Sequence, residues 1–323
     1  MNTPQPQVSI GLVTWNSERY ISTCLRGLRQ QDGVAYELIV VDNGSSDQSL
    51  ARVRQELPDA RIVANPRNNG FCGAHNQAIR LARGEYYLPL NPDIQLQPGY
   101  LAAMVAALQS DPACGMAAAR LYLGTPEEPS GRLDSTGLFM DRKRRQTLRG
   151  HGELDTGQYA CQEEVFGVDG SAPLYRREML EDVKIDGQYF DETFFAHKED
   201  VDLCWRARLL GWKCIYTPQA VAYHERQFRP GQRKNMASEI RLDAVKNRYL
   251  LAIKNETAAG WRRDWLPILW YDLKIVTYML LLERSSLPAL ARAWRLRPTA
   301  LAWRREIMRR RKAADDDLLR WFV

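Results

Sequence analysis

The first 123 residues alternate short apolar runs with segments of helical period, and this alternation constrains the fold more than any other feature. The apolar runs predict strands at 8–13, 37–41, 61–64, 86–90 and 116–121. The segments between them predict helices at 17–28, 49–56, 74–82 and 99–108. A parallel strand pair needs such a crossover helix. We therefore expect an α/β fold whose mainly parallel sheet carries helices on both faces.

The chain changes character after residue 123. Residues 124–162 are rich in Gly, Pro and charge and predict loops or a short hairpin. Further strands are predicted at 164–175, 214–216 and 220–223, and further helices at 178–183 and 199–210. Everything after 238 has helical character. We expect a body over 1–237, made of halves 1–123 and 124–237, and a helical C-terminal extension over 238–323.

The composition is that of a globular protein with an ordinary core, at 45% hydrophobic and 26% charged residues. Six Cys without close paired spacing argue against a disulfide framework or a zinc site, so we read them as reduced thiols in a cytoplasmic chain. The polar first residues carry no apolar signal region.

Positive charge is concentrated in the extension. Residues 284–312 hold ten Arg or Lys and one acid, a net +9, so the rest of the chain carries −3 of the total +6. Six of the nine Trp also lie beyond residue 260. Arg and Trp together suit a partner with anionic head groups and an apolar boundary, and the interleaved Leu and Trp favour a membrane surface over nucleic acid.

One helix of the extension has an apolar stripe, formed by Leu266, Leu269, Leu273, Val276 and Leu280. The run 266–282 is short for a membrane span and contains charges. Two interpretations stay open. The helix packs on the body or on another subunit of a homo-oligomer, or it lies on the inner membrane leaflet.

Polar residues follow three of the predicted strands: Thr14-Trp-Asn16, Asp42-Asn-Gly44 and Asn91-Pro-Asp93. Ligands of open α/β sheets bind beyond the carboxyl ends of strands. The chain lacks both a Gly-x-Gly-x-x-Gly fingerprint after the first strand and a Walker A loop. Asp42 suits the polar groups of a nucleoside, and Asp93 suits a divalent cation on a diphosphate. Capping of a turn is the alternative for each.

A second acidic cluster opens a helix at Glu199-Asp200-Val-Asp202. Helix N-termini favour anions, so Asp202 is interpreted as a cap and Asp200 as a general base for a hydroxyl group. His224 ends a strand and is a candidate metal or phosphate ligand, although a lone His is more often structural. Arg206 is interpreted as a solvated helix residue, with a phosphate contact as the alternative.

These motifs together resemble the family 2 glycosyltransferases, inverting enzymes of the GT-A fold, from about Val8 to His224. Asn68-Asn-Gly-Phe-Cys-Gly-Ala-His-Asn76 is similar to a loop of the rhamnosyltransferase-like branch. The resemblance makes Asp200 the catalytic base, and it places Gly170, Ser171 and Glu199 on the acceptor side. It implies Mg²⁺ or Mn²⁺ at Asp93 and His224. Asn91 stands where the family has the first Asp of Asp-x-Asp, which weakens the metal site. The implied donor-nucleotide contacts are Thr14, Asn16, Asp42, Asn43, Asn69, Gly70, Asn76 and Asn91.

The resemblance implies a hexosyltransferase that uses dTDP-rhamnose or a similar dTDP- or UDP-sugar. The implied acceptor is a hydroxyl of a cell-surface glycan or a polyprenyl-linked sugar, reached by a cytoplasmic enzyme peripheral to the inner face of the plasma membrane. A nucleotidyltransferase and a non-catalytic binding module are the alternatives. The hypothesis requires that Asp42, Asp93 and Asp200 converge around one crevice.

Overall fold

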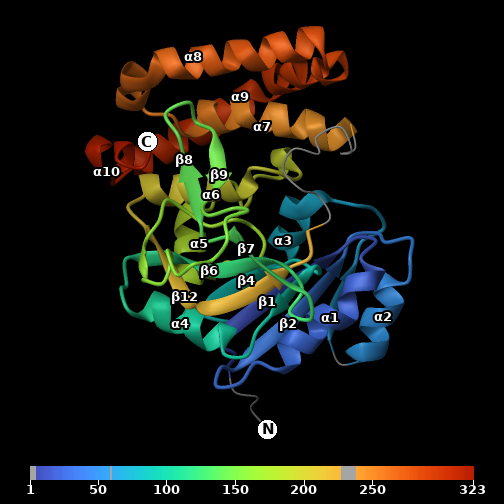
Figure 1. The fold of residues 1–323 in the computed structure, drawn as a ribbon. Helices are drawn as coiled ribbons and strands as arrows, with labels where there is room; N and C mark the ends of the chain where they lie inside the picture. The colour runs from blue at the N-terminus through green and yellow to red at the C-terminus, as the bar shows by residue number, and fades with distance from the viewer. Residues whose placement is uncertain (1–4, 59, 227–237) are drawn as a thin grey trace.

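The computed structural model describes residues 5–58, 60–226 and 238–323, and it is a mixed α/β structure topped by helices (Figure 1). Within these ranges the main sheet has ten strands, eight of them in the order β10-β12-β6-β11-β4-β1-β2-β3. Helices cover both faces of this mainly parallel sheet, so the predicted fold class is confirmed.

The first half of the sheet consists of parallel strands that match the apolar runs of the sequence. They are β1 (Val8–Thr14), β2 (Tyr36–Asp42), β3 (Arg61–Ala64) and β4 (Tyr86–Leu90). Side chains alternate between the two faces of a strand. Ile39 and Val41 therefore join one core cluster, and Val40 joins the other. Continuous apolar runs arise because both faces of these strands are covered.

Helices α1 (Glu18–Arg29), α2 (Ser49–Glu56) and α4 (Tyr100–Gln109) cover one face of the sheet. Helices α3 (Gly70–Leu81), α5 (Arg177–Val183) and α6 (Glu199–Leu209) cover the other. Helix α3 begins four residues before its predicted start, because the Asn/Gly-rich segment that looked like a loop already contains its first turn.

The second half of the sheet is less regular. β6 (Cys114–Gly124) runs parallel to β12 (Lys213–His224), and the short β11 (Leu174–Arg176) lies antiparallel between β4 and β6. The two strands predicted within 213–224 are one strand, irregular between Thr217 and Val221. The remaining strands are β5 (Ile94–Leu96), β7 (Pro129–Ser135), β10 (Glu163–Glu164) and the hairpin of β8 (Leu138–Met140) with β9 (Gln146–Leu148).

The single strand predicted over 164–175 is wrong. Only its ends are strands, in β10 and β11, and the residues between them form a loop. Phe166 and Val168 in this loop are buried in the core, which explains the apolar run. Burial of a loop and burial of a strand leave the same local signal, so the sequence pattern could not separate them.

Pro89 sits inside β4 at a point where its missing N–H costs little. The antiparallel register pairs Tyr87 with Tyr175, and its continuation sets Pro89 opposite Pro173. Two positions further along the same register, a hydrogen bond links the strands again: the Asn91 N–H donates to the Ser171 carbonyl at 3.0 Å. Two prolines facing each other remove donors only from a short gap in the ladder.

The extension consists of α7 (Ser238–Asn255), α8 (Ala258–Leu281), η3 (Arg284–Ser286), α9 (Pro288–Arg310) and α10 (Asp315–Leu319). In Figure 1, α8 is the outermost helix, and α7 and α9 lie between it and the body. Leu250 of α7, Trp303 of α9 and Leu318 of α10 belong to the same core cluster as α3 and α6. The extension and the sheet therefore share one hydrophobic core.

Buried ion pairs reinforce this attachment. Lys254 of α7 has no exposed surface, and its ammonium lies 2.6 Å from Asp191 and 2.9 Å from Asp202. Arg144, at the tip of the β8–β9 hairpin, pairs with Glu256 at 2.6 Å and with Asp264 of α8 at 2.9 Å. The basic run 142–145 thus ties the hairpin to the extension.

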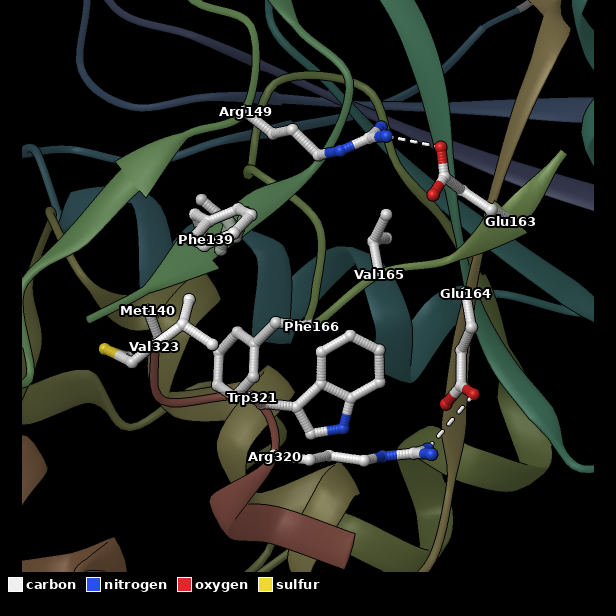
Figure 2. A pocket seen from close by; sticks show the side chains of 11 residues that line it. Phe139, Met140, Arg149, Glu163, Glu164, Val165, Phe166, Arg320, Trp321 and Val323 are labelled. Atoms are coloured by element: carbon white, nitrogen blue, oxygen red, sulfur yellow. Dashed lines mark hydrogen bonds and ion pairs between the residues drawn. The ribbon is translucent and has the colours of Figure 1, made fainter. Parts of the chain in front are cut away.

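The last residues of the chain pack against the hairpin and β10, as Figure 2 shows. Phe322 forms a parallel bridge with Met140, and the Val323 N–H donates to the Met140 carbonyl at 3.3 Å. Trp321, Phe139 and Val165 line a pocket of about 220 Å³ here, with ion pairs Arg149–Glu163 and Arg320–Glu164 at its rim. This pocket lies away from the polar strand ends.

The apolar stripe of α8 faces outward. Leu266, Leu269 and Leu273 are 63%, 47% and 55% exposed, and Trp265, Trp270 and Leu280 are also exposed. These leucines therefore do not pack on the body, whereas Val276 of the same stripe is partly buried against a cluster of α7, α8 and α9. Among the described residues, no single helix is long and apolar enough to cross a bilayer. Ala258–Leu281 and Arg284–Arg310 satisfy that test only as a pair, bent by 117°.

Candidate active site

Asp42 and Thr14 end two adjacent parallel strands, and their side chains meet. Thr14 Oγ1 donates to Asp42 Oδ1 at 3.0 Å, and the Ser45 N–H donates to Asp42 Oδ2 at 3.1 Å. Both side chains are buried. The β1–β2 pairing, which places Thr14 directly beside Asp42, fixes this geometry at the sheet edge.

Asn43 organises the Asn/Gly-rich loop. Its amide nitrogen donates to Asn68 Oδ1 at 2.9 Å and to the Gly70 carbonyl at 3.0 Å, while its oxygen accepts from the Asn69 N–H at 3.2 Å. Gly70 has φ +73°, and a Cβ there would lie 2.6 Å from the Phe195 carbonyl oxygen. A side chain cannot fit at this close approach, so glycine is required where α3 starts.

Asn16 and Asn76, two further asparagines expected to contact the donor nucleotide, have different surroundings. Asn16 is exposed, and its oxygen accepts from the Ser46 N–H at 2.9 Å. Asn76 has no exposed surface, and both ends of its amide bond the backbone of Tyr189 and Phe190. This amide holds that segment against α3, and its hydrogen bonds to Phe190, Glu192 and Tyr189 leave no donor or acceptor for a nucleotide.

Asp93 and His224 come together from separate strands. The antiparallel pairing of β5 with β12 sets His224 opposite Ile94, and His224 Nε2 lies 3.4 Å from Asp93 Oδ1. The other ring nitrogen, Nδ1, lies 2.7 Å from Asp134 Oδ2 at the end of β7. The histidine is 3% exposed, so both of its ring nitrogens face protein carboxylates.

Asp134 is a site residue that the sequence interpretation missed. It has no exposed surface and contacts His224, Arg226 Nε at 2.5 Å and His151 Nδ1 at 3.2 Å. Burial opposes charge on His224, yet the hydrogen bonds that its ring donates to Asp134 and Asp93 outweigh burial and raise its pKa to about 9. The same partners hold the pKa of Asp134 well below its usual range.

The segment 169–171 connects Asn91 with Asp200. The Ser171 carbonyl accepts from the Asn91 N–H, and the Gly170 N–H donates to Asp200 Oδ2 at 3.1 Å. Asp169, 9% exposed, accepts from the Ser171 N–H at 3.1 Å. A Cβ on Gly170 would lie 3.5 Å from Phe71 and 3.6 Å from both Glu199 and Asp200.

The carboxylates of Glu199 and Asp200 have raised pKa values. Burial, followed by the neighbouring Asp169, raises the pKa of Asp200 to about 6 against hydrogen bonds from the Val201 and Gly170 N–H groups. Burial and the charge of Asp200 raise the pKa of Glu199 further, and Glu199 Oε2 is buried without a hydrogen-bond partner among the described residues. A carboxylate with a pKa near neutrality is suited to proton transfer.

Asp202 and Arg206 have structural roles that differ from their predictions. Lys198, not Asp202, caps α6, and its carbonyl accepts from the Asp202 N–H. The Asp202 carboxylate is buried between Arg206 at 2.9 Å and Lys254 at 2.9 Å. Arg206 is fully buried and also donates to the Val183 and Tyr189 carbonyls. Both predictions were wrong because α7, distant in sequence, covers this helix.

The described contacts bring the predicted carboxylates to one edge of the sheet. Asn43 beside Asp42 bonds Gly70, the next residue Phe71 neighbours Gly170, and Gly170 bonds Asp200. Ser171 in turn bonds Asn91, two residues before Asp93. Asp200 therefore lies on the same side of the molecule as Asp93, and no ion pair neutralises it among the described residues.

The donor set near Asp93 fits a cation that shares its ligands with a substrate. In the described part of the chain, no three His, Cys, Asp or Glu side chains are grouped to hold a metal ion. Asp93 supplies one carboxylate, and His224 supplies one imidazole once a cation displaces the Nε2 proton that its raised pKa retains. A divalent ion in nucleotide enzymes commonly takes one or two protein side chains and completes its shell with phosphates and water. The residues present suit that arrangement.

Residues 9–184 match the family model described as Glycosyl transferase family 2. The chain belongs to this family. This membership favours glycosyl transfer over the nucleotidyltransferase and binding-module alternatives.

The transferase resembles the N-acetylglucosaminyl-diphospho-decaprenol L-rhamnosyltransferase of Mycobacterium tuberculosis. The two are 25% identical over 280 residues, which cover 80% of this chain and 86% of that one. Three other curated relatives are 27–28% identical, and the chain spans only 21%, 61% and 49% of their lengths.

Two solved structures share the fold of the transferase. One is S. aureus TarS 1–349 in complex with UDP-GlcNAc, with a TM-score of 0.57 and 17% identity, covering 94% of this chain and 89% of that chain. The other is the mannosyltransferase PcManGT from Pyrobaculum calidifontis in complex with GDP-Man and Mn²⁺. Its TM-score is 0.54 at 20% identity, with coverage of 95% and 86%.

Proposed function

We propose that the transferase moves a sugar, with inversion, from a nucleoside-diphosphate sugar to a hydroxyl of a polyprenyl-linked or polysaccharide acceptor. Asp200 is the general base. The observation that carries the proposal is the position of Asp200: its carboxylate is unpaired, has a pKa raised to about 6, and shares one sheet edge with Asp42 and Asp93.

The reaction is a single displacement. Asp200 accepts the proton of the acceptor hydroxyl as its oxygen attacks the anomeric carbon from the face opposite the diphosphate. The bond between the anomeric carbon and the diphosphate oxygen breaks, and the nucleoside diphosphate leaves. Asp42 and Thr14 bind the nucleoside, and the loop at Asn69 and Gly70 closes the donor side. Holding both substrates in line supplies much of the rate.

Asp93 and His224 would hold Mg²⁺ or Mn²⁺, which supplies positive charge for the leaving diphosphate. Asp134 orients the imidazole through Nδ1 and so leaves Nε2 directed toward Asp93. Asn91 carries no charge, so the protein contributes one carboxylate here. The Mn²⁺ present in the PcManGT structure supports a divalent ion in this fold.

The donor and acceptor are proposed from the similarity to the mycobacterial enzyme. Its name specifies rhamnosyl transfer onto a sugar linked by diphosphate to decaprenol. We propose a deoxy-hexose donor such as dTDP-rhamnose and a lipid-linked acceptor. The exposed apolar face of α8 and the basic extension support a cytoplasmic enzyme that is peripheral to the inner membrane face.

Replacing Asp200 tests the proposal. Asp200→Asn preserves the size of the side chain and keeps an oxygen that can accept from a backbone N–H, but the amide cannot take a proton. We expect transfer to fall by about 10²–10⁴-fold with nucleotide-sugar affinity retained. Asp111→Asn is the matched control, because that partly exposed carboxylate contacts Lys213 and the Ala113 N–H and lies outside the candidate site. Unchanged turnover in Asp200→Asn would refute the assigned base.

A further inference from the structure

A second pocket, of about 440 Å³, lies between the helical extension and the body. Val245 of α7 and Ile275 and Met279 of α8 form its apolar wall, with Tyr271 and Tyr278 beside them. Gln146 of β9 and Lys198 close the side nearest the candidate active site. The pocket therefore joins the extension, the hairpin and the start of α6.

The pocket is lined by four cations, and no carboxylate is among its described lining residues. The cations are Arg145, Lys198, Arg248 and Lys274. Arg248 pairs with Asp272 at 2.7 Å, outside the lining. No ion pair joins the other three to a described carboxylate. Lys198 Nζ donates to Gln146 at 2.7 Å, and burial, followed by the charge of Arg248, lowers the pKa of Lys198 to about 8. Such a concentration of positive charge favours a polyvalent anion.

Continuity with the active site identifies which anion fits. Lys198 precedes Glu199 and Asp200 directly, and it interacts electrostatically with both. An anionic group in the pocket would thus sit beside the base, so a sugar attached to it could present a hydroxyl there. The donor-side residues Asp42 and Asp93 belong to other elements and do not line this pocket.

The outward face of α8 continues from the pocket. Lys274 lines the pocket and also stacks on Trp270, 5.2 Å from the ring centroid, and Trp270 is 56% exposed. Leu266, Leu269 and Leu273 extend this exposed surface along the helix. An apolar chain leaving the pocket past Lys274 would meet this surface at once.

We propose that this pocket binds the diphosphate of a lipid-linked acceptor and that the lipid chain lies along the exposed face of α8. The inference rests on the proposed glycosyl transfer and assigns it an acceptor subsite. An occupant that carries charge and a long apolar chain together fits both surfaces, because the lining supplies cations and the exposed face of α8 beside Lys274 supplies Trp270 and the leucines.

Farnesyl diphosphate is a soluble probe of this subsite, with farnesol and inorganic pyrophosphate as its two halves. Binding is measured by titration calorimetry on the full chain and on Arg145→Ala and Lys274→Ala. Arg305→Ala is the matched control, since Arg305 is an exposed cation of α9 outside the pocket. Donor binding is measured in parallel with the nucleotide sugar.

We expect farnesyl diphosphate to bind more tightly than either half, and each pocket variant to weaken it by about tenfold while Arg305→Ala does not. Equal binding of pyrophosphate or of farnesol, or unchanged binding in both pocket variants, would overturn the subsite. A failure of the proposed function would give a different result, because the unmodified chain would then not bind the nucleotide sugar.

Discussion

His224 and Asp134 form a buried pair in which Nδ1 of the imidazole lies 2.7 Å from the carboxylate. Asp134 is the penultimate residue of β7, and His224 ends β12, so two separate strands fix the ring. A hydrogen bond at Nδ1 fixes the orientation of the ring and therefore the direction in which Nε2 points. Here Nε2 faces Asp93.

Removing the charge of Asp134 should loosen this arrangement. In Asp134→Asn we expect the Mn²⁺ concentration for half-maximal transfer to rise by about 10–100-fold, because the partner that orients the proposed ligand is weakened. Metal titration of the initial rate measures the effect. Asp111→Asn serves as the control, and an unchanged metal requirement in Asp134→Asn would remove Asp134 from the metal site.

The pKa of Asp200 sets a pH dependence. With a pKa of about 6, the base is protonated below that pH and inactive, so the transfer rate should rise tenfold per pH unit below 6 and level off above it. Rates at saturating donor across pH 5–8 measure this, and a flat profile would contradict it.

The same shift predicts a stability change of defined sign. The folded pKa of Asp200 lies above the ordinary value of about 4, so ionisation costs stability as pH rises from about 4 to 6. Asp200→Asn should therefore raise the melting temperature at pH 7.5 and leave it nearly unchanged at pH 4. A variant less stable than the parent at pH 7.5 would show that the carboxylate is held by favourable contacts instead.

Lys254 should be essential for stability. Lys254→Met leaves Asp191 and Asp202 buried beside an apolar group, and loss of one partner of a buried pair costs about 3–5 kcal/mol. Urea denaturation measures the loss, with exposed Arg305→Met as the control. A loss below about 1 kcal/mol would mean that the extension does not depend on this cluster.

The exposed face of α8 should bind anionic membranes. Replacing Leu266, Leu269 and Leu273 together by Ser removes exposed apolar surface, so the melting temperature should stay constant while affinity for phosphatidylglycerol vesicles falls by at least about tenfold. Co-sedimentation measures binding. If the parent chain is a dimer that ignores vesicles and the variant a monomer, the face is a subunit interface.

Local pattern was sufficient for the first half of the sheet. The predicted ranges of β3, β4 and α2 match the structure. The two strands are short apolar runs packed from both faces of the sheet, and the helix has an unambiguous period. Prediction failed where burial comes from distant segments. The charged groups of Asp202 and Arg206 are buried because α7 covers them. The loop at Phe166 is apolar because α6 and the end of the chain pack around it.

The candidate site divides in the same way. Residues at strand ends, such as Asp42 and Asp93, could be named from the sequence because parallel strands bring their carboxyl ends together. Asp134 could not, since the Gly-, Pro- and charge-rich sequence around it predicts a loop and hides strand β7, and Asp134 meets His224 only through a contact spanning 90 positions. The stripe on α8 was visible as a period of three and four, but a period identifies one face without saying which way it points.

The shared core has a consequence for how the protein is made. Trp303, Ile307 and Phe322 complete the hydrophobic cluster on the α3–α6 side of the sheet. During synthesis, α3, α5 and α6 reach that side of the sheet first, and the part of the cluster that these three residues cover stays exposed until they have emerged from the ribosome. Exposed apolar surface promotes aggregation, so we expect the growing chain to depend on chaperones until its final helices are translated.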